Sequence, residues 1–462
     1  MEHTRIIISD LHVGQQDEFD IFACPGSNKN ALFTSFLNYI RDRNDPIELV
    51  INGDFVDFLQ LRPWNNLSRE TALEKIKDIV AKSPTVFSSL GNFLGDARHK
   101  LKILPGNHDV ELAYPEVGKV LRDAILKSVP KAADRFDLFG PPDSIRTTHT
   151  PKINGIQVQI EHGNEGDPFN SLHYTTLFND AEKGTKEFSY PPGTLLVYDI
   201  MNGFKEEFRF VDLLKPEMPA VVLILLALKP FMSALKIPGI SIKMLLAAGN
   251  LVDTLLRRKF GGMPLGPKPS ATITNLKVHP LETLLSETFP EEKPPQLQDL
   301  DVFLSGTEIP GVAANQTLGR SFKKVRLWLL SWALQGLARF QKVEQGEDFF
   351  KKDYPNNFAA KGARSRLKGD VKVVVFGHTH EALKTEFAEG LYMNSGTWAD
   401  LVTLPQDGNE PILKWLDMVS NNTFERTAYP TFVRIQPTES GISVGLNLWT
   451  NAGEQPLWEK NI

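Results

Sequence analysis

Five short blocks along the chain carry side chains that could bind a metal ion or move a proton. Each block follows a run of apolar or β-branched residues that is typical of a buried strand. The blocks are Asp10-Leu11-His12, Gly53-Asp54-Phe55-Val56-Asp57, Gly106-Asn107-His108-Asp109, Glu161-His162-Gly163 and Gly377-His378-Thr379-His380. In an open α/β sheet, ligands bind outside the carboxyl ends of the strands, so we expect all five blocks to meet in one crevice.

The side chains that would gather there are typical ligands of transition metals. They are two aspartates, an asparagine and four histidines, namely Asp10, Asp54, Asn107, His12, His162, His378 and His380. Neutral imidazoles mixed with carboxylates suit Mn, Fe, Co or Zn better than Ca or Mg. A tetrahedral ion takes four ligands, so seven donors are enough for two ions if one carboxylate bridges them.

The spacing within the blocks adds an expectation about local geometry. Strand side chains alternate with a period of two, so Asp10-x-His12 and His378-x-His380 should each lie along an extended segment with both ligands on one side. Glycines in the other blocks, such as Gly53 and Gly106, allow sharp turns that bring the backbone close to the ions.

Each block alone also has an ordinary structural explanation. A lone His-x-His or Asp-x-His pair is common by chance, and Gly-Asn-His-Asp is a favourable turn sequence. His162 could be a hydrogen-bonded core histidine and Asp54 a helix cap. For Asp57, a local salt bridge or a helix start is favoured over a role in the site. Five blocks that all end strands favour the metal site over these separate explanations.

Taken together, the blocks resemble the signature of the calcineurin-like metallophosphoesterases, which is Asp-x-His, Gly-Asp, Gly-Asn-His-Asp, His and Gly-His-x-His. The resemblance covers residues 4–165 and about 370–400 and does not extend to the region between them. It implies an α/β fold, a four-layer αββα sandwich in which helices flank two facing β-sheets, and a dinuclear metal centre.

The resemblance also implies a role for each matching residue. The first ion would be held by Asp10, His12 and His380, and the second by Asn107, His162 and His378. Asp54 would bridge the two ions. His108 would stand beside the leaving group, and Asp109 would orient it.

The chemistry implied is direct hydrolysis of a phosphoester bond by a metal-bridging hydroxide, with no covalent enzyme intermediate. His108 would stabilise or protonate the leaving oxygen. Two divalent ions are expected as cofactors, with Mn favoured and Fe, Zn, Co or Ni as alternatives. The expected substrate is a phosphodiester or pyrophosphate of a small or lipid-linked molecule.

Departures from related enzymes narrow the substrate class. Protein phosphatases of this superfamily continue the second block with Asp-Arg-Gly, whereas this chain has Asp57-Phe58-Leu59, which disfavours a phosphoprotein substrate. The diacylglucosamine pyrophosphohydrolase of the lipid A pathway typically has Arg at the place of His108, which disfavours that particular substrate. A nuclease and a metal-free interaction scaffold are the alternative functions.

Composition limits the alternatives. The 462 residues include 51 Lys and Arg against 56 Asp and Glu, and this net charge of −5 gives no sign of a general nucleic-acid binder. Cys24 is the single cysteine, which favours a reducing, cytoplasmic location. The most apolar stretch, 220–235, contains Lys229-Pro230 and is shorter than the ~20 residues of a membrane-spanning helix.

The pattern of elements predicts one α/β domain with an insertion. Strands are expected at 5–9, 47–52, 100–104, 156–161, 371–376, 382–387, 391–394, 431–436 and 442–449, and helices at 31–43, 67–94 and 318–342. The metallophosphoesterase core is expected to comprise residues 1–165 and 369–462, with a mainly helical cap at 166–368.

The insertion allows three interpretations. Its apolar stretch and the basic, Trp-bearing helix 318–342 could form a helical cap over the site, a dimer interface, or a surface for a lipid substrate or peripheral membrane contact. Its first segment, 165–170, directly follows the fourth block. That segment is either an acidic surface loop or a part of the chain that reaches the substrate.

Overall fold

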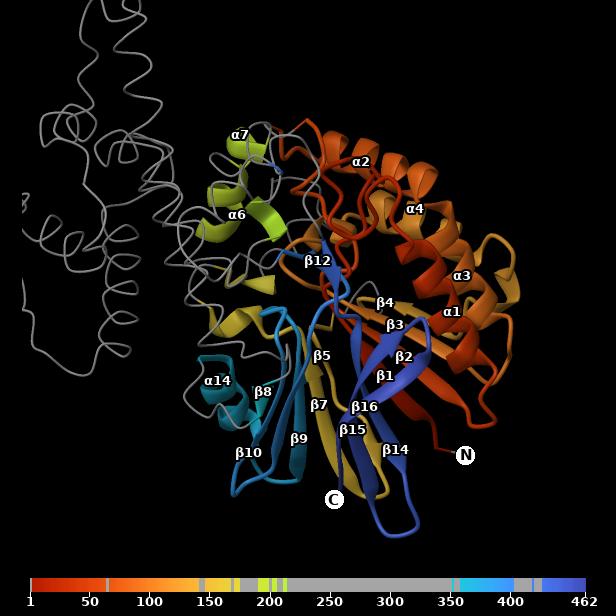
Figure 1. The fold of residues 1–462 in the computed structure, drawn as a ribbon, viewed down its shortest axis with the longest axis vertical. Coiled ribbons are helices and arrows are strands. Elements are labelled where there is room, and N and C mark those ends of the chain that lie inside the picture. Colours follow the sequence, from red (N-terminus) through yellow and green to blue (C-terminus); the bar gives the residue numbers. More distant parts are fainter. Residues whose placement is uncertain are drawn as a thin grey trace, which may run out of the picture. The chain divides into compact units, whose positions relative to one another are not determined.

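A computed structural model describes residues 2–63, 66–140, 146–167, 170–174, 190–198, 202–205, 211–213, 351–352, 358–402, 418 and 426–462 (Figure 1). All of them belong to one compact unit, formed by Met1–Pro216, Arg339–Leu404 and Lys414–Ile462. A second unit comprises Glu217–Ala338 and Pro405–Leu413. The helix expected at 318–342 and the apolar stretch 220–235 therefore lie outside the described residues.

The first sheet carries the strands that precede the first three blocks. Four neighbouring strands are parallel, β1 (Thr4–Ile8), β2 (Ile47–Asn52), β3 (Lys100–Leu104) and β4 (Phe136–Leu138). On the other side of β1 follow three antiparallel strands, β14 (Thr431–Pro437), β15 (Ile442–Thr450) and β16 (Gly453–Asn461). The carboxyl ends of β1, β2 and β3 therefore lie at one edge.

The second sheet carries the strands that precede the last two blocks. Its order is β5 (Thr148–His149), β7 (Ile156–Glu161), β9 (Val371–Phe376), β11 (Leu391–Ser395), β10 (Ala382–Glu386) and β8 (Lys351–Lys352), with β6 (Lys152–Ile153) paired to β7. Strands β7 and β9 are parallel, so the blocks that follow them leave the sheet on the same edge. A separate short pair joins β12 (Asp400–Leu401) and β13 (Thr427–Ala428).

Helices cover the outer faces of both sheets. The first sheet is covered by α1 (Lys29–Arg41), α2 (Arg69–Lys82), α3 (Pro84–Leu94) and α4 (Pro115–Leu126), and α14 (Phe358–Arg366) packs on the second. Shorter helices are α6 (Pro192–Leu196), α7 (Asn202–Lys205) and the 3-10 turns η1 (Val110–Ala113), η2 (Pro130–Ala132), η3 (Asn164–Gly166) and η5 (Val211–Leu213). None of the described helices is long and apolar enough to span a membrane.

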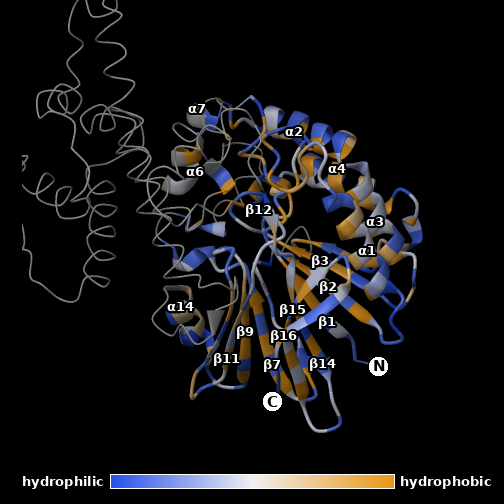
Figure 2. Ribbon diagram, in the orientation of Figure 1, coloured by the Kyte–Doolittle hydropathy of each residue, from blue (hydrophilic) through white to orange (hydrophobic). Residues whose placement is uncertain are grey.

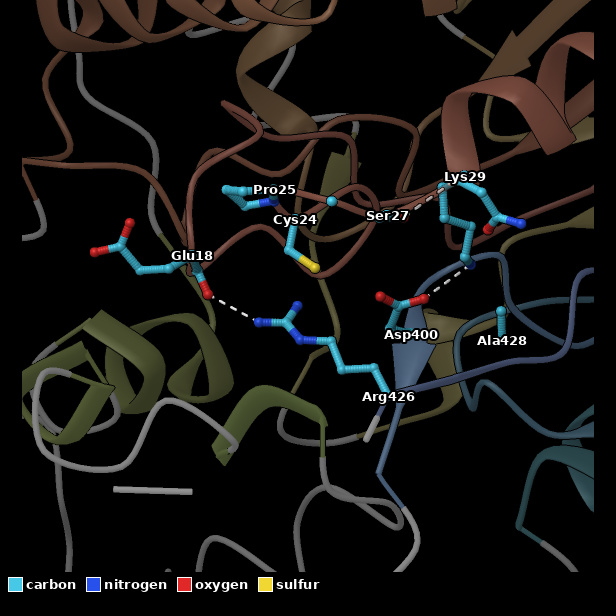
Figure 3. Close-up of a pocket in the computed structure, with 10 residues that line it drawn as sticks. Glu18, Cys24, Pro25, Ser27, Lys29, Asp400, Arg426 and Ala428 are labelled. Carbon is cyan, nitrogen blue, oxygen red and sulfur yellow. Dashed lines mark hydrogen bonds and ion pairs between the residues drawn. The ribbon is translucent and has the colours of Figure 1, made fainter. Parts of the chain in front are cut away.

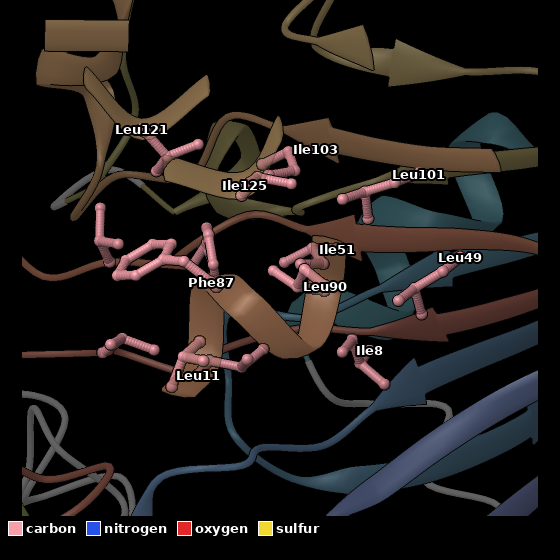
Figure 4. Close-up of a cluster of buried hydrophobic side chains, with 14 of the residues drawn as sticks. Ile8, Leu11, Leu49, Ile51, Phe87, Leu90, Leu101, Ile103, Leu121 and Ile125 are labelled. Atoms are coloured by element: carbon pink, nitrogen blue, oxygen red, sulfur yellow. The ribbon is translucent and has the colours of Figure 1, made fainter. Parts of the chain in front are cut away.

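Side chains along the central strands face the helices and the other sheet in turn, which explains the layered packing of helices and sheets (Figure 2). In β2, Leu49 and Ile51 face the helices, where Figure 4 shows Ile51 beside Leu90 of α3. Val50, between them in sequence, faces the other sheet and shares a buried cluster with Val375 of β9. The two sheets therefore face each other between layers of helix, which confirms an α/β fold of two mixed sheets; the helical character expected for the insertion falls mainly on residues outside those described.

Candidate metal centre

The first three blocks meet directly at the edge of the first sheet. The Asp10 amide donates a hydrogen bond to the Gly53 carbonyl (3.2 Å), and the His12 amide donates to the Asp54 carbonyl (2.9 Å). From the third block, the His108 amide donates to Oδ1 of Asp54 (2.8 Å). The turns after β1, β2 and β3 are therefore joined to one another.

The last two blocks join this edge from the second sheet. The Gly377 amide donates to the His162 carbonyl (2.9 Å), which links the turns after β7 and β9. The His378 amide donates to Oδ2 of Asp10 (3.0 Å), which connects the two sheets. All five blocks thus converge, as their places at strand ends predict.

One group of donors surrounds the position expected for the first ion. The ligand atoms of Asp10, His12 and His380 all lie within 4.8 Å of one another, and all three residues are buried. Nε2 of His380 is 3.0 Å from Nε2 of His12 and 3.2 Å from Oδ1 of Asp10. Ligands bound to one ion at about 2.1 Å lie roughly 3.0–3.4 Å apart, so this spacing suits a metal.

A second group lies at the position expected for the other ion. It consists of Asp54, His162 and His378, again with ligand atoms within 4.8 Å of one another. Oδ2 of Asp54 is 3.1 Å from Nε2 of His162 and 3.8 Å from Nε2 of His12, a member of the first group. One carboxylate oxygen therefore faces both groups.

Hydrogen bonding around His162 directs its Nε2 atom toward Asp54. Nδ1 of His162 lies 2.8 Å from the Asn52 carbonyl, which only accepts, so Nδ1 carries a hydrogen and donates it. Nε2 then faces the Asp54 carboxylate and requires a proton or a metal ion between the two. Burial lowers the pKa of His162, but the negative charges of Asp54 and Asp10 outweigh it and raise that pKa to about 9. The same field favours a divalent cation.

Asn107 adds an oxygen donor that protein groups leave unused. Its Oδ1 atom is buried and accepts no hydrogen bond from the described residues. A buried amide oxygen without a partner costs about 1–3 kcal/mol. An ion at the second group, beside the turn that joins Asn107 to Asp54 through His108, would satisfy it.

The backbone at the donors is strained. Five of them have positive φ, namely Asp10 (53°), His12 (52°), Asp54 (52°), His378 (68°) and His380 (59°). Left-handed backbone at non-glycine residues costs on the order of 1–3 kcal/mol each and is typical of functional sites. The extended geometry expected for Asp10-x-His12 and His378-x-His380 is therefore wrong, because both segments coil as soon as their strand ends.

Glycine is required at two positions in this centre. A Cβ atom on Gly106 would lie 2.0 Å from Oδ1 of Asp54, and one on Gly53 would lie 2.4 Å from Nδ1 of His162. Both distances are far shorter than van der Waals contact. These two glycines allow the backbone to approach the donor side chains.

His108 lies at the rim of the site and is oriented by Asp57. Oδ2 of Asp57 lies 3.1 Å from Nδ1 of His108 and 2.8 Å from Nδ1 of His12. The side chain of Asp57 is 4% exposed and that of His108 is 15% exposed, so the histidine alone reaches toward solvent. The structural role favoured for Asp57 from sequence is therefore incomplete; its place in the same block as Asp54 was the only signal of this contact.

Asp109 holds the backbone of the site. Its carboxylate accepts from the amides of Phe55 (2.8 Å) and Gly106 (2.7 Å), which links the second and third blocks. Burial, and next the negative charge of Asp54, raise the pKa of Asp109 to about 8. The carboxylate at Nδ1 of His108 is that of Asp57, so the orienting role expected for Asp109 corresponds to Asp57 in the structure.

A cavity of about 480 Å³ lies between the loop after β1 and the β12–β13 pair (Figure 3). Lys29 in its wall is 3.2 Å from Asp400, and the Arg426 guanidinium donates to the Glu18 and Asp20 carbonyls (2.8 Å each). Lys29 and Arg426 are thus already paired with neighbouring groups of the protein. None of the predicted metal ligands lines it.

The fold and the site together define a class, an α/β sandwich whose strand ends hold donors for two metal ions. Residues 3–196 match the family model described as calcineurin-like phosphoesterase, a stretch that contains the first four blocks. Over these residues the chain is similar to the calcineurin-like phosphoesterases. The fifth block lies beyond the matched residues, yet the structure brings its two histidines to the same centre.

Comparison with solved structures finds more distant likenesses. A dimetal phosphatase from Danio rerio is 10% identical, with 98% of each chain covered and a TM-score of 0.32. A Vps29 double mutant from Entamoeba histolytica is 15% identical, with a TM-score of 0.15. That match covers 22% of this chain and 46% of the Vps29 chain, less than half of its length. Comparison with curated proteins finds no match.

Proposed function

We propose that this protein hydrolyses a phosphodiester or pyrophosphate bond in a small or lipid-linked substrate, with two divalent transition ions as cofactors. The observation that carries the proposal is the position of the Asp54 carboxylate. Its Oδ2 atom faces His162 of one donor group at 3.1 Å and His12 of the other at 3.8 Å. A bridging carboxylate in this place is what a dinuclear centre requires.

The donors divide into two sets around Asp54. We assign Asp10, His12 and His380 to one ion and Asn107, His162 and His378 to the other. When bound, the ions supply Lewis-acid activation of the phosphoryl group and a water of lowered pKa. Imidazoles mixed with carboxylates suit Mn, Fe, Co, Ni or Zn, and we favour Mn.

We assign His108 to the leaving group. Its Nδ1 donates to Asp57, so the other ring nitrogen points away from this carboxylate. Its side chain is 15% exposed, beside the buried donors Asp54 and His12, which supports a contact with substrate. Proton donation to the leaving oxygen by such a group is typically worth about 10²–10⁴ in rate.

Three further assignments belong to the same proposal. The single cysteine favours a cytoplasmic protein. The insertion would either select the substrate, contact a membrane surface or bind a second copy of the chain. The net charge of −5 favours a small or lipid-linked substrate over a nucleic acid. Hydrolysis measured with and without lipid vesicles would distinguish a small substrate from a lipid-linked one.

The test is a hydrolysis screen with the full-length protein and Mn²⁺. Substrates are bis-(p-nitrophenyl) phosphate, p-nitrophenyl phosphate, cyclic nucleotides, UDP-lipids and single-stranded DNA. We expect turnover of a diester or pyrophosphate, reduced about 10²–10⁴-fold in Asp54→Asn because the bridging charge is lost. Asp123→Asn, a change of an exposed carboxylate on α4, is the matched control and should behave like the wild type.

Three results would contradict the proposal. They are wild-type turnover by Asp54→Asn, full activity after metal removal, and hydrolysis of DNA alone. The last result would favour the nuclease.

A further inference from the structure

Three histidines in the centre each have an oxygen partner on one ring nitrogen. Nδ1 of His12 donates to Asp57 (2.8 Å), and Nδ1 of His162 donates to the Asn52 carbonyl (2.8 Å). Such partners fix which nitrogen of a metal-binding histidine is left to bind the ion. For His12 and His162, the nitrogen left is Nε2.

His378 has the opposite arrangement. Its Nε2 atom lies 3.2 Å from Oδ2 of Asp167, in the segment that follows β7. Asp167 is not part of the donor group formed by Asp54, His162 and His378. The carboxylate therefore contacts the imidazole at Nε2, which leaves Nδ1 for the ion.

We infer that Asp167 is a positioning residue for the metal centre, which holds the ring of His378 with Nδ1 toward the second ion. This inference rests on the proposed function, because it requires that His378 bind a metal. It deepens that function by giving the first segment of the insertion a part in assembling the site.

The segment around Asp167 is built to hold this carboxylate in place. Asn170 donates through Nδ2 to Oδ2 of Asp167 (2.8 Å), and the Asp167 amide donates to the Asn164 carbonyl (3.0 Å). Asn164 in turn donates to the Asn170 carbonyl (2.9 Å) and accepts from the buried Tyr174 hydroxyl (3.0 Å). The acceptor for His378 is thus fixed before any ion binds.

A neighbouring acid in the same segment shows that the contact of Asp167 is specific. Glu165 stands two residues earlier, but its carboxylate faces Arg366 of α14, with 3.7 Å between Oε2 and Nη2. Asp167 is 24% exposed at its side chain and faces His378, which is 13% exposed. Within residues 165–170, Asp167 thus contacts a predicted metal ligand, while contact of this segment with a substrate stays a prediction.

The experiment measures metal binding by the full-length protein. The wild type, Asp167→Ala, Asp167→Asn and Glu165→Ala are stripped with EDTA and titrated with Mn²⁺ by calorimetry, with EPR spectra recorded for the coupled Mn pair. We expect Asp167→Ala to weaken the second ion about 10–100-fold and leave the first unchanged. Asp167→Asn keeps an acceptor for Nε2 and should recover part of the affinity, while Glu165→Ala should match the wild type.

The outcomes separate this inference from the proposed function. If the wild type binds two ions and Asp167→Ala binds both as tightly, the inference is wrong and the proposed function stands. It is also wrong if Asp167→Ala weakens both ions equally or lowers the unfolding temperature of the metal-free protein, since either result indicates a structural role. If the wild type binds no ion, the proposed function fails together with it.

Discussion

Asp57 is buried and uses both of its carboxylate oxygens. Oδ1 accepts from the amides of Leu59 (2.8 Å) and Gln60 (3.1 Å), and Oδ2 accepts from the rings of His12 and His108. Burial raises the pKa of Asp57, but His108 and then His12 outweigh it and hold that pKa well below its usual value. One ionised carboxylate therefore connects a predicted metal ligand, His12, to His108, which we assign to the leaving group.

The change Asp57→Asn tests this connection at the scale of a single residue. An amide keeps the size of the side chain but replaces the charge, so His12 becomes a weaker ligand and His108 loses its orientation. We expect kcat to fall about 10–100-fold, with KM changed less, and Mn²⁺ affinity to fall as well. Steady-state kinetics and metal titration measure both. Wild-type kcat with wild-type affinity would show that Asp57 is only a structural residue.

The turns after the strands are as important as the side chains they carry. The loop after β3 passes so close to the loop after β2 that Gly106 has no room for a side chain beside Asp54. The strained φ values of the donors occur in the same turns. Packing of the strands behind them must offset this strain.

The change Gly106→Ala tests how the turn after β3 packs against Asp54. The added methyl would displace the carboxylate, because it would lie 2.0 Å from Oδ1 and 2.4 Å from the Asp54 amide nitrogen. We expect loss of at least one ion and a destabilisation of about 1–3 kcal/mol. Gly362→Ala in α14 is the control, since its nearest contacts are 3.9 Å away and alanine favours helix. Equal metal binding by both variants would contradict the expected crowding.

The elements that sequence predicts best are those with strong apolar patterns of their own. Strands β1, β2, β3, β7 and β9 fall within a residue of their expected bounds, since each is rich in β-branched and aliphatic residues that are mostly buried. Strand β16 was not predicted, because its GEQPLWEKN sequence has no alternation and its order comes from pairing with β15. Helix α4 is not among the expected helices, although Val117, Leu121 and Ile125 have helical spacing.

The candidate site likewise has features that the sequence predicts and features that it does not. Strand ends can be read from sequence, so the convergence of the five blocks was predictable. Which group a side chain contacts depends on shifts of a few ångströms in the turns. No sequence pattern therefore predicts that His108 contacts Asp57, or that Asp109 binds backbone amides instead. Positive φ at the donors was likewise unpredictable, because it arises only when the turns are packed together.

At the scale of the whole core, the proposed metal centre draws on both sheets. Loops of the first sheet would supply Asp10, His12, Asp54 and Asn107, and loops of the second would supply His162, His378 and His380. The relative position of the sheets therefore determines the distances between donors. Buried aliphatic side chains such as Ile7 and Val373 fill the space between the sheets. Full burial of each such side chain contributes roughly 1.5–3 kcal/mol.

A polar contact also ties the two sheets together. Glu48 of β2 accepts from Arg5 of β1 (3.0 Å) and from His149 of β5 in the other sheet (3.2 Å). Burial raises the pKa of Glu48, but His149 and then Arg5 outweigh it and lower that pKa to about 2, from 4.5. A carboxylate with a lowered pKa stabilises the fold above its unfolded pKa and loses this contribution as the pH falls toward the folded value.

The change Glu48→Gln should therefore destabilise the core in a manner that depends on pH. We expect a loss on the order of 2–3 kcal/mol at pH 7, which shrinks as the pH falls from about 5 to about 2. Urea unfolding of the wild type and the variant at several pH values measures the difference directly. A difference that stays constant between pH 7 and pH 2.5 would show that the ionised carboxylate does not hold the sheets together. A difference that disappears would locate the acid sensitivity of this fold in one contact between its two sheets.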